Sequence, residues 1–528
     1  MIETNRARTR LEKAYRQQNW PMVRHRAAML LRDDPDNAEL HFMCGVADMQ
    51  TGQVSGAVEA LVKASKLEPE RPDYLAHHAQ ALARMRRLRE ACEVADRAMG
   101  LPFEDARTAE QLGQVFLQAL ALERAADAFR RAVTLKPGQA PLRFLLGYTL
   151  AALGDARAAQ RQLEQCIDLE PRHWPAHLSL SKLQQQTRET QHIERLRTLL
   201  SSHSGDLGAQ IFLNMALAKE HEDLEEYSAA FEHYSRGKGA ARSTRPPSAE
   251  RDQRMFEALI RAFPTPRPKP GGRETPDAPI FIVGMPRTGT TLLNRMLSNH
   301  PMVAAAGELQ HFPTLLQQAS GSPIALLSQP DIAAHLDGID WTRLGKDYID
   351  SARPVGTTQP RFTDDMPHNF LYAGFIARAL PHARIVCLRR DPLDTCLGNY
   401  RHLFQLESGF YDYSLDLLDT GRYFIQFDRL MSHWREVLPG HILEVSYESL
   451  VSSPETVMRQ VLPFCGLPWD DACLHSESNT SPVNTPNAWQ VRAPIYTAAV
   501  GRWRRYAPQL QALQQLLADP ELRQDLSA

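Results

Sequence analysis

The stretch APIFIVGMPRTGTTLLNRML, residues 278–297, joins an apolar run to a polar loop and then to a segment with helical periodicity. The run APIFIVG suits a buried parallel strand, and the last part repeats leucine and methionine at helical spacing. Gly284 and Gly289 bound the loop and let the backbone turn tightly. Successive N–H groups and the N-terminus of the next helix then point at one anion. The stretch predicts a strand, an anion-binding loop and a helix.

The loop differs from that of a nucleoside triphosphatase. A Walker A loop reads GxxxxGK[ST], and Thr290 occupies its lysine position here. The loop carries Arg287 in its middle, and Thr290 and Thr291 add hydroxyl donors. Arginine presents a planar fork of donors to an oxyanion and stays charged. A P-loop kinase is disfavoured, because both the lysine and a Mg²⁺-ligand signature are missing.

The stretch ARIVCLRRDPLDTCLGNYRHLF, residues 383–404, repeats this arrangement. RIVCL has the pattern of a buried strand, Asp391 suits a helix N-cap and Pro392 suits the first helical position. Arg390 then lies on the turn between strand and helix. Arg390 is therefore predicted to be a second anion anchor. The alternative is that Arg390 only forms an ion pair with Asp391 or Asp394.

The first half of the chain contains a repeat of about 34 residues. Small residues, leucines and unit-closing prolines recur in four registers: Gly45, Ala79, Gly113 and Gly147; Ala57, Ala91, Ala125 and Ala159; Leu67, Leu101, Leu135 and Leu169; Pro69, Pro102, Pro137 and Pro171. Two amphipathic helices with small residues at their crossing and a proline beyond the second resemble the tetratricopeptide repeat. The resemblance covers about residues 3–206, and a further helical pair extends it to about residue 240. Its groove implies a protein or peptide partner, with scaffolding or homodimerisation as alternatives.

The motif GMPRTGTT, residues 284–291, resembles the 5′-phosphosulfate-binding loop of sulfotransferases, whose usual form is PRSGTT. These enzymes transfer a sulfuryl group from 3′-phosphoadenosine 5′-phosphosulfate to a hydroxyl or an amine. The resemblance extends from residue 279 to about 510, and the best match is to tyrosylprotein sulfotransferases and their bacterial repeat-containing relatives. It implies that the following residues hold the donor: Gly284, Pro286, Arg287, Thr288, Gly289, Thr290 and Thr291.

The same resemblance gives roles to residues further along. Arg390 corresponds to the arginine that grips the 3′-phosphate, and Tyr447, in the segment ILEVSYESL, closes on the nucleotide. Arg492 and Arg502 are candidate phosphate contacts in a carboxy-terminal flap. The alternative for these two arginines is a solvated helix face around RWRRY.

For the acceptor proton, HPMVAAAGELQHF resembles the segment of the tyrosylprotein enzymes that carries the catalytic glutamate. Glu308, 21 residues beyond Arg287, is the predicted general base. Arg287 and the loop amides are predicted to stabilise the transferring group. His311 is the alternative base, because cytosolic small-molecule sulfotransferases use a histidine. The non-catalytic alternative is a surface or N-capping Glu308.

Two departures from the family pattern concern hydroxyl donors. The family serine eight residues after Arg390 falls on Gly398, for which the helix backbone or His402 is expected to substitute. A further family serine falls on Asn487. Both positions weaken the expected grip on the donor.

A third departure concerns charge. Relatives read D-K-x-P where this chain reads DDMP, which puts Asp365 in place of a lysine that would stabilise the leaving oxygen. A carboxylate there repels the phosphosulfate. The only lysine in residues 279–528 is Lys346, so Lys346, His368 or an arginine is expected to supply the missing charge.

The amino-acid composition limits the number of domains and the kinds of partner, metal centre and location that are expected. A chain of 528 residues with 43% apolar and 23% charged residues is expected to form two or three globular domains. The net charge of -2 argues against a nucleic-acid partner. Seven cysteines are scattered without a CxxC pair or metal-ligand spacing, and no run of about 18 apolar residues occurs. These features predict a soluble, cytoplasmic protein without a metal centre or a membrane span.

The sequence thus predicts an α-solenoid of tetratricopeptide-like repeats at 1–262, a Pro/Gly-rich linker at 263–278 and an α/β, P-loop-like sulfotransferase domain with a central parallel sheet at 279–528. The predicted function is sulfuryl transfer from 3′-phosphoadenosine 5′-phosphosulfate to a hydroxyl acceptor, with protein tyrosine as one such acceptor. The repeats are expected to recruit the acceptor or a partner. The alternative is a non-catalytic, nucleotide-binding module that assembles partners.

Overall fold

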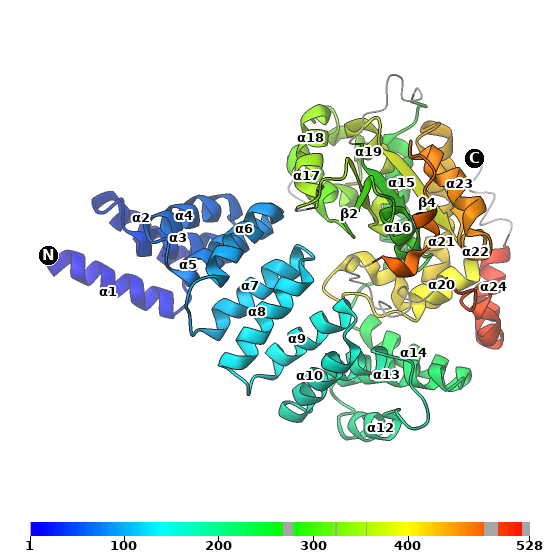
Figure 1. Ribbon diagram of the computed structural model, residues 1–528, viewed down its shortest axis with the longest axis horizontal. Coiled ribbons are helices and arrows are strands. Elements are labelled where there is room, and N and C mark those ends of the chain that lie inside the picture. The colour runs from blue at the N-terminus through cyan, green and yellow to red at the C-terminus, as the bar shows by residue number, and fades with distance from the viewer. Residues whose placement is uncertain (1, 268–277, 323–324, 355, 480–494, 520–528) are drawn as a thin grey trace. The chain divides into compact units, whose positions relative to one another are not determined.

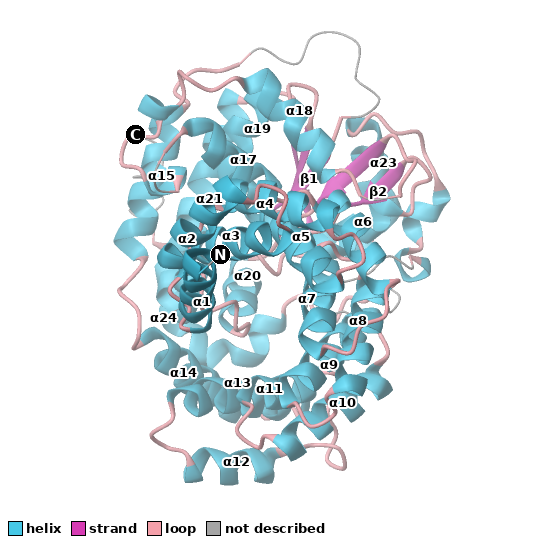
Figure 2. Ribbon diagram, turned by 90° about the vertical axis from the view of Figure 1, so that its left-hand side faces the viewer, coloured by secondary structure: helices cyan, strands magenta, loops and turns pink. Residues whose placement is uncertain are grey.

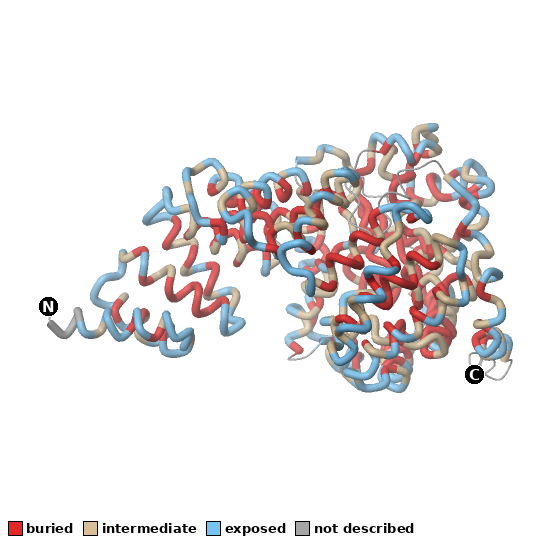
Figure 3. The backbone as a smooth tube through the Cα atoms, turned by 90° about the horizontal axis from the view of Figure 1, so that it is seen from below, coloured by how far each residue is buried: buried red, intermediate tan, exposed pale blue. Residues whose placement is uncertain are grey.

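The computed structural model describes residues 2–267, 278–322, 325–354, 356–479 and 495–519. The chain divides into two compact units, Met1–Pro171 and Arg172–Ala528. Figure 1 colours them along the chain, and Figure 3 shows that buried segments run through both units. Each unit therefore has a core of its own.

The amino-terminal unit is built from consecutive helix pairs. Its helices are α1 (Ile2–Arg16), α2 (Trp20–Asp33), α3 (Ala38–Gln50), α4 (Val54–Leu67), α5 (Pro72–Arg84), α6 (Leu88–Met99), α7 (Ala106–Gln118), α8 (Leu122–Leu135), α9 (Ala140–Leu153) and α10 (Ala156–Leu169). A Cβ atom on Gly45 would lie 2.5 Å from Leu61, and one on Gly113 would lie 2.5 Å from the Phe129 ring. The small-residue register thus marks where paired helices cross, and the predicted repeat architecture is confirmed.

Five helices at the start of the second unit continue the helical pattern: α11 (Trp174–Lys182), α12 (Ile193–Ser202), α13 (Leu207–Asp223), α14 (Tyr227–Arg242) and α15 (Ala249–Ala262). The sequence placed these helices with the repeats, whereas the boundary between the two compact units falls after Pro171. The helices belong to the second unit because they pack against it. Lys238 of α14 is fully buried and donates to the main-chain carbonyls of His402 and Ser414, at 2.6 and 2.9 Å. These helices therefore belong structurally with the sheet.

The predicted linker is packed where it begins. Phe263 is buried, with its ring centroid 5.3 Å from that of Trp434, and the backbone N–H of Arg267 donates to the carbonyl of Val437 at 2.8 Å. Residues 268–277 of the predicted linker lie outside the described residues.

The second unit contains a five-stranded sheet, magenta in Figure 2, with the order β2-β3-β1-β4-β5. The strands are β1 (Ile280–Val283), β2 (Val303–Ala305), β3 (Arg361–Asp364), β4 (Arg384–Arg389) and β5 (Ile442–Ser446). Every pairing between neighbours is parallel, as predicted. All four residues of β1 are buried, because helices cover both faces of a parallel sheet.

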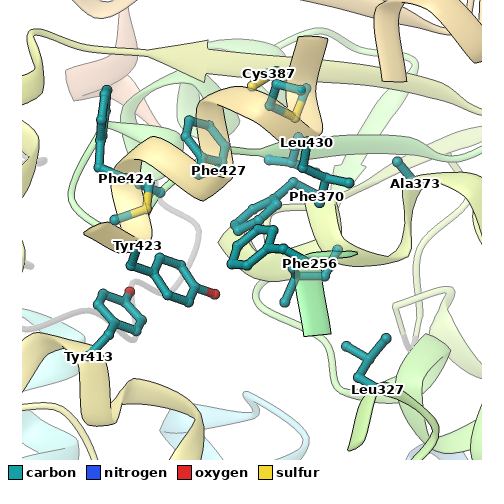
Figure 4. Packing of buried hydrophobic residues seen from close by; sticks show 14 of the residues in the cluster. Phe256, Leu327, Phe370, Ala373, Cys387, Tyr413, Tyr423, Phe424, Phe427 and Leu430 are labelled. Atoms are coloured by element: carbon teal, nitrogen blue, oxygen red, sulfur yellow. The ribbon is translucent and has the colours of Figure 1, made fainter. Parts of the chain in front are cut away.

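The remaining helices are α16 (Thr290–Ser298), α17 (His311–Ser320), α18 (Trp341–Ala352), α19 (Ala373–Ala379), α20 (Pro392–Tyr400), α21 (Leu417–Val437), α22 (Tyr447–Ser452), α23 (Pro454–Phe464) and α24 (Gln511–Ala518). Aromatic rings join α15 and α21 to the loop after β3. Phe370 stacks on Phe256 with centroids 6.4 Å apart and meets Phe427 edge-on at 4.8 Å (Figure 4). This core fixes α15 against the domain that carries the sheet.

The strand order positions the site. β1 lies beside β4, and the chain leaves β1 toward β2 on one side and leaves β4 toward β5 on the other. The loops that follow two such neighbouring strands diverge and leave a crevice at the carboxyl edge of the sheet. Both predicted anion anchors follow these two strands.

Candidate functional site

The loop after β1 requires both of its glycines. Gly284 has φ +150°, and a Cβ atom there would lie 2.6 Å from the carbonyl oxygen of Leu388 in β4. Gly289, which caps α16, has φ +102°, and a Cβ atom there would lie 2.6 Å from the Tyr447 ring. Residues with side chains are strained in this left-handed region and clash at both points. The predicted strand, loop and helix are thus present, and the loop is packed tightly against its neighbours.

Two loop residues play different parts. Arg287 adopts φ +69°, which is uncommon for a residue other than glycine. Burial, followed by the positive charges of Arg401 and Arg390, lowers the pKa of Arg287 to about 10. The Thr288 hydroxyl donates to the carbonyl of Met285 at 2.8 Å, inside the loop. Arg287 is therefore the charged group of the loop, and Thr288 holds the loop in shape.

The second anchor begins as the sequence predicted. Asp391 caps α20 by accepting from the N–H of Asp394 at 3.0 Å, and Pro392 is the first helical residue. The Arg390 guanidinium lies 4.7 Å from the Tyr447 ring centroid and 3.7 Å from the Asp394 carboxylate. The ion pair considered as an alternative is present, and Arg390 nevertheless lines the cavity described next.

A cavity of about 400 Å³ opens at this edge of the sheet. Most of the predicted site residues line it: Pro286, Arg287, Gly289, Thr290, Thr291, Glu308, Arg390, Gly398, Tyr447 and Arg502. Gly284 and Thr288 do not line it and instead shape the loop. Arg492 and Asn487 lie outside the described residues. The structure thus brings both anion anchors and the predicted base to one cavity.

Gly398 packs next to Arg287, the arginine of the first anion anchor. A Cβ atom at this position would lie 3.2 Å from Cβ of Arg287, so the missing family hydroxyl would have faced that arginine. His402, the expected substitute, also lines the cavity. Burial, followed by the charges of Lys182 and Arg287, holds the pKa of His402 well below its usual range. His402 is therefore neutral at pH 7 and is able to donate or accept a hydrogen bond.

Glu308 follows β2 and lies in the cavity wall, exposed where the cavity opens to solvent. Its protein surroundings, followed by the carboxylate of Asp365, raise the pKa of Glu308, and the charge of Arg287 opposes them. His311, the alternative base, is buried and does not line the cavity. The geometry thus favours Glu308 over His311.

The structure corrects the expectation for Asp365. Its carboxylate is buried, it does not line the cavity, and its backbone N–H donates to the carbonyl of Gly307 at 3.2 Å. Burial raises the pKa of Asp365 as well. Asp365 therefore acts on Glu308 rather than standing against a bound anion.

The expected replacements for the missing lysine are placed elsewhere. Lys346 is exposed on α18, and His368 is buried with a pKa lowered to about 3 by burial, and neither lines the cavity. Two lysines do line it, Lys182 of α11 and Lys219 of α13. The sequence did not reveal these two lysines, because both lie outside residues 279–528 and no local spacing connects them to the anion loop.

Glu222 of α13 is a further residue that the sequence did not reveal. It accepts hydrogen bonds at 3.0 Å from Arg401 Nε and from the Tyr234 hydroxyl, and Arg502 lies 3.7 Å away. Burial opposes its charge, but these partners dominate and lower the pKa of Glu222. One carboxylate thus fixes two cavity-lining arginines.

The carboxy-terminal segment is attached to α20. The Asp394 carboxylate accepts from the N–H groups of Gly501 and Trp503 at 2.7 and 2.8 Å, and Arg390 donates to the carbonyl of Ala499. This attachment places Arg502 in the cavity wall. Among the described residues, no group of three or more His, Cys, Asp or Glu side chains is arranged to hold a metal ion, and a metal-free site stays a prediction.

The fold and the site together define an α/β domain with a parallel sheet and an arginine-rich cavity at its carboxyl edge. Residues 279–471 match the sulfotransferase family, and residues 140–173 match the tetratricopeptide repeat. As predicted, the α/β domain is thus similar to sulfotransferases, and part of the helical region is similar to the tetratricopeptide repeat.

Known proteins resemble the chain over parts of their length. It is 30% identical to an uncharacterised protein of Aquifex aeolicus (strain VF5) over 414 residues. This alignment covers 75% of this chain and 54% of that protein. It is 26% identical over 254 residues to the protein-tyrosine sulfotransferase of Drosophila melanogaster, which covers 42% of this chain and 46% of that enzyme. The chain thus spans about half the length of these curated relatives. The structure of YrrB, described as a tetratricopeptide-repeat protein with an unusual peptide-binding site, aligns over 39% of this chain and 96% of its own, with 16% identity and a TM-score of 0.29.

Proposed function

We propose that this protein transfers a sulfuryl group from 3′-phosphoadenosine 5′-phosphosulfate to a hydroxyl acceptor. The observation that carries the proposal is that Arg287, Arg390 and Glu308 line one cavity in a domain that is similar to sulfotransferases. Relatives named protein-tyrosine sulfotransferases support a tyrosine hydroxyl on a protein or peptide as the acceptor.

In the proposed reaction, the acceptor oxygen attacks sulfur as the bond between sulfur and the bridging oxygen of the 5′-phosphate breaks. The electron pair of that bond leaves with the bridging oxygen on adenosine 3′,5′-bisphosphate, and the acceptor proton passes to the Glu308 carboxylate. Arg287 and the loop amides face the charge of the transferring group, and Arg390 holds the 3′-phosphate. The raised pKa of Glu308 makes it a stronger base than a glutamate with an unperturbed pKa.

Binding and turnover test the proposal in that order. Calorimetry with adenosine 3′,5′-bisphosphate in the presence of a chelator is expected to show binding. Labelled phosphosulfate is then expected to label a tyrosine peptide or a phenol from a panel. Glu308→Gln keeps the side-chain shape and is expected to abolish transfer while leaving nucleotide affinity nearly unchanged. Retained transfer in this variant would remove Glu308 from the mechanism, and Mg²⁺-dependent ATP binding in place of bisphosphate binding would favour a kinase.

A second candidate function is a nucleotide-binding module without turnover. Gly398 favours it, because a family hydroxyl donor is missing directly beside Arg287. Bisphosphate binding with no transfer to any acceptor on the panel is the result expected for such a module.

We propose further that the repeats bind the protein or peptide acceptor, with homodimerisation as the alternative. Light scattering of the full chain, with and without the best acceptor peptide of the panel, separates a 1:1 complex from a dimer. We also propose a cytoplasmic location on the basis of cysteine usage, and all seven cysteines are buried thiols. None of the described helices has the length and apolar character needed to cross a bilayer.

A further inference from the structure

Three lysines of the helical segment before the linker lie close enough to act on one another electrostatically, and two of them have side-chain partners. Lys219 pairs with the Asp223 carboxylate, and Lys238 donates to the carbonyls of His402 and Ser414. The Lys182 side chain makes no hydrogen bond or ion pair with any residue in the part of the chain that the structure describes. Lys182 lines the cavity.

The backbone that carries Lys182 is held in place. Lys182 is the last residue of α11, and the neighbouring Ser181 is buried and donates to the Glu220 carboxylate of α13 at 2.6 Å. Glu220 is fully buried and also accepts from the N–H of His192 at the start of α12. Three helices therefore fix the point from which the Lys182 side chain extends.

The electrostatic neighbours of Lys182 identify the end of the cavity that it serves. Burial, and then the charges of Arg287 and Lys219, lower the pKa of Lys182 to about 8. Lys182 acts on His402 and Lys238 in the same way. Lys182 and Arg287 thus line the same cavity within each other's field, and an anion bound at the Arg287 end of the cavity is stabilised by both.

We propose that Lys182 contacts the sulfuryl oxygens of the bound donor and replaces the lysine that relatives carry at the position of Asp365. This inference rests on the proposed function, which assigns the Arg287 end to the sulfuryl group. A lysine ammonium offers three donors on a flexible stem, which suits oxygens that move as sulfur passes between two oxygen atoms. The catalytic charge thereby comes from α11, outside the residues that match the sulfotransferase family.

Lys182→Met tests the proposal, with Lys346→Met on the exposed face of α18 as the matched control. Affinities are measured in the full chain for adenosine 3′,5′-bisphosphate, which lacks the sulfuryl group, and for the phosphosulfate, which carries it. Lys182→Met is expected to weaken phosphosulfate binding about tenfold, and Lys182→Arg is expected to restore part of it. Bisphosphate binding and the melting temperature are expected to stay at wild-type values, because Lys182 has no protein partner to lose. Where an acceptor is found, the transfer rate is expected to fall about 100-fold.

The outcomes separate this inference from the function on which it rests. If the wild-type protein binds both nucleotides and Lys182→Met binds both unchanged, Lys182 does not contact the donor and the proposed function stands. If both affinities fall by the same factor, Lys182 contacts the 5′-phosphate and the sulfuryl assignment is wrong. If the wild-type protein binds neither nucleotide, the proposed function fails and this inference fails with it.

Discussion

Arg390 donates a hydrogen bond to the main-chain carbonyl of Arg287, with 3.0 Å between Nη1 and the oxygen. The two anion anchors, 103 positions apart in the sequence, are therefore joined directly. Because Arg390 also contacts the Tyr447 ring and the carbonyl of Ala499, one guanidinium links the loop after β1, α22 and the carboxy-terminal segment. A ligand that reaches both anchors meets a preorganised wall, which reduces the entropic cost of binding.

Arg390→Gln tests the second anchor, and Arg389→Gln is its control. Arg389 is adjacent in sequence but pairs with Asp428 and Glu444 instead of lining the cavity. We expect Arg390→Gln to weaken binding of adenosine 3′,5′-bisphosphate by at least about tenfold, because a charge-assisted contact to phosphate is lost. Binding of adenosine 5′-phosphate, which lacks the 3′-phosphate, should change much less. Equal losses for the two nucleotides in a calorimetric titration would contradict the role of Arg390.

Gly289→Ala tests how tightly the loop is packed. The new Cβ atom would lie 2.6 Å from the Tyr447 ring at a residue with φ +102°, so we expect a loss of about 1–3 kcal/mol in the free energy of unfolding. Nucleotide affinity should fall as well, because the displaced loop carries the amides of the anion site. Gly239→Ala in α14 is the control, since no atom lies within 4 Å of its added Cβ, and this variant should be slightly stabilised. Urea unfolding measures the stability of both variants. Equal stabilities of Gly289→Ala and Gly239→Ala would argue against the steric explanation.

The acid limb of the pH–rate profile reports on Glu308. Only its ionised form accepts a proton, so kcat/KM should rise with pH through an apparent pKa above the usual range for glutamate. Asp365 is the second-largest cause of the raised pKa of Glu308, after the protein surroundings of this side chain. Asp365→Asn removes that negative charge, which lowers the pKa of Glu308 and should move the acid limb to lower pH.

The control for this prediction is Asp350→Asn on the exposed face of α18, which should leave the profile unchanged. An acid limb that moves to higher pH in Asp365→Asn, or does not move, would show that another group is the base.

Local chemistry explains why much of this site was predictable. The glycines of the anion loop, the Asp391 cap and Pro392 act over a few residues, and the structure has each of them where the sequence placed it. The parallel strands β1 and β4 were predicted from short runs of mainly apolar residues. That these strands are neighbours is a property of the whole sheet, and it brings Arg287 and Arg390 together.

Long-range packing explains what could not be predicted. Glu222 and Arg401 are 179 positions apart, and no spacing or motif in the sequence indicates that they are in contact. The periodicity of α13 indicates a helix, but it does not reveal that the helix packs against the sulfotransferase-like domain. The burial of Asp365 outside the cavity lining depends in the same way on tertiary structure. The division into compact units falls after Pro171 and not at the predicted boundary of residue 262, since the 34-residue repeat carries no information about which helices the second unit buries.

Glu222→Gln tests whether α13 is part of the active unit. The side chain of Glu222 is 10% exposed, and its carboxylate pairs with Arg401 and faces Arg502. Loss of its charge leaves two partly buried cations without their counter-ion, so we expect the free energy of unfolding to fall by about 3 kcal/mol. Bisphosphate affinity should fall too, because both arginines line the cavity.

Glu232→Gln on α14 is the matched control, since its ion pair with Arg236 is exposed on both sides and is worth at most about 0.5 kcal/mol. Urea unfolding gives the stabilities, and calorimetry gives the affinities. If Glu222→Gln matched Glu232→Gln in both measurements, α13 would be a neighbour of the cavity without a role in holding it. A loss in both, restricted to Glu222→Gln, would establish that a helix preceding the sulfotransferase-like domain completes its binding site.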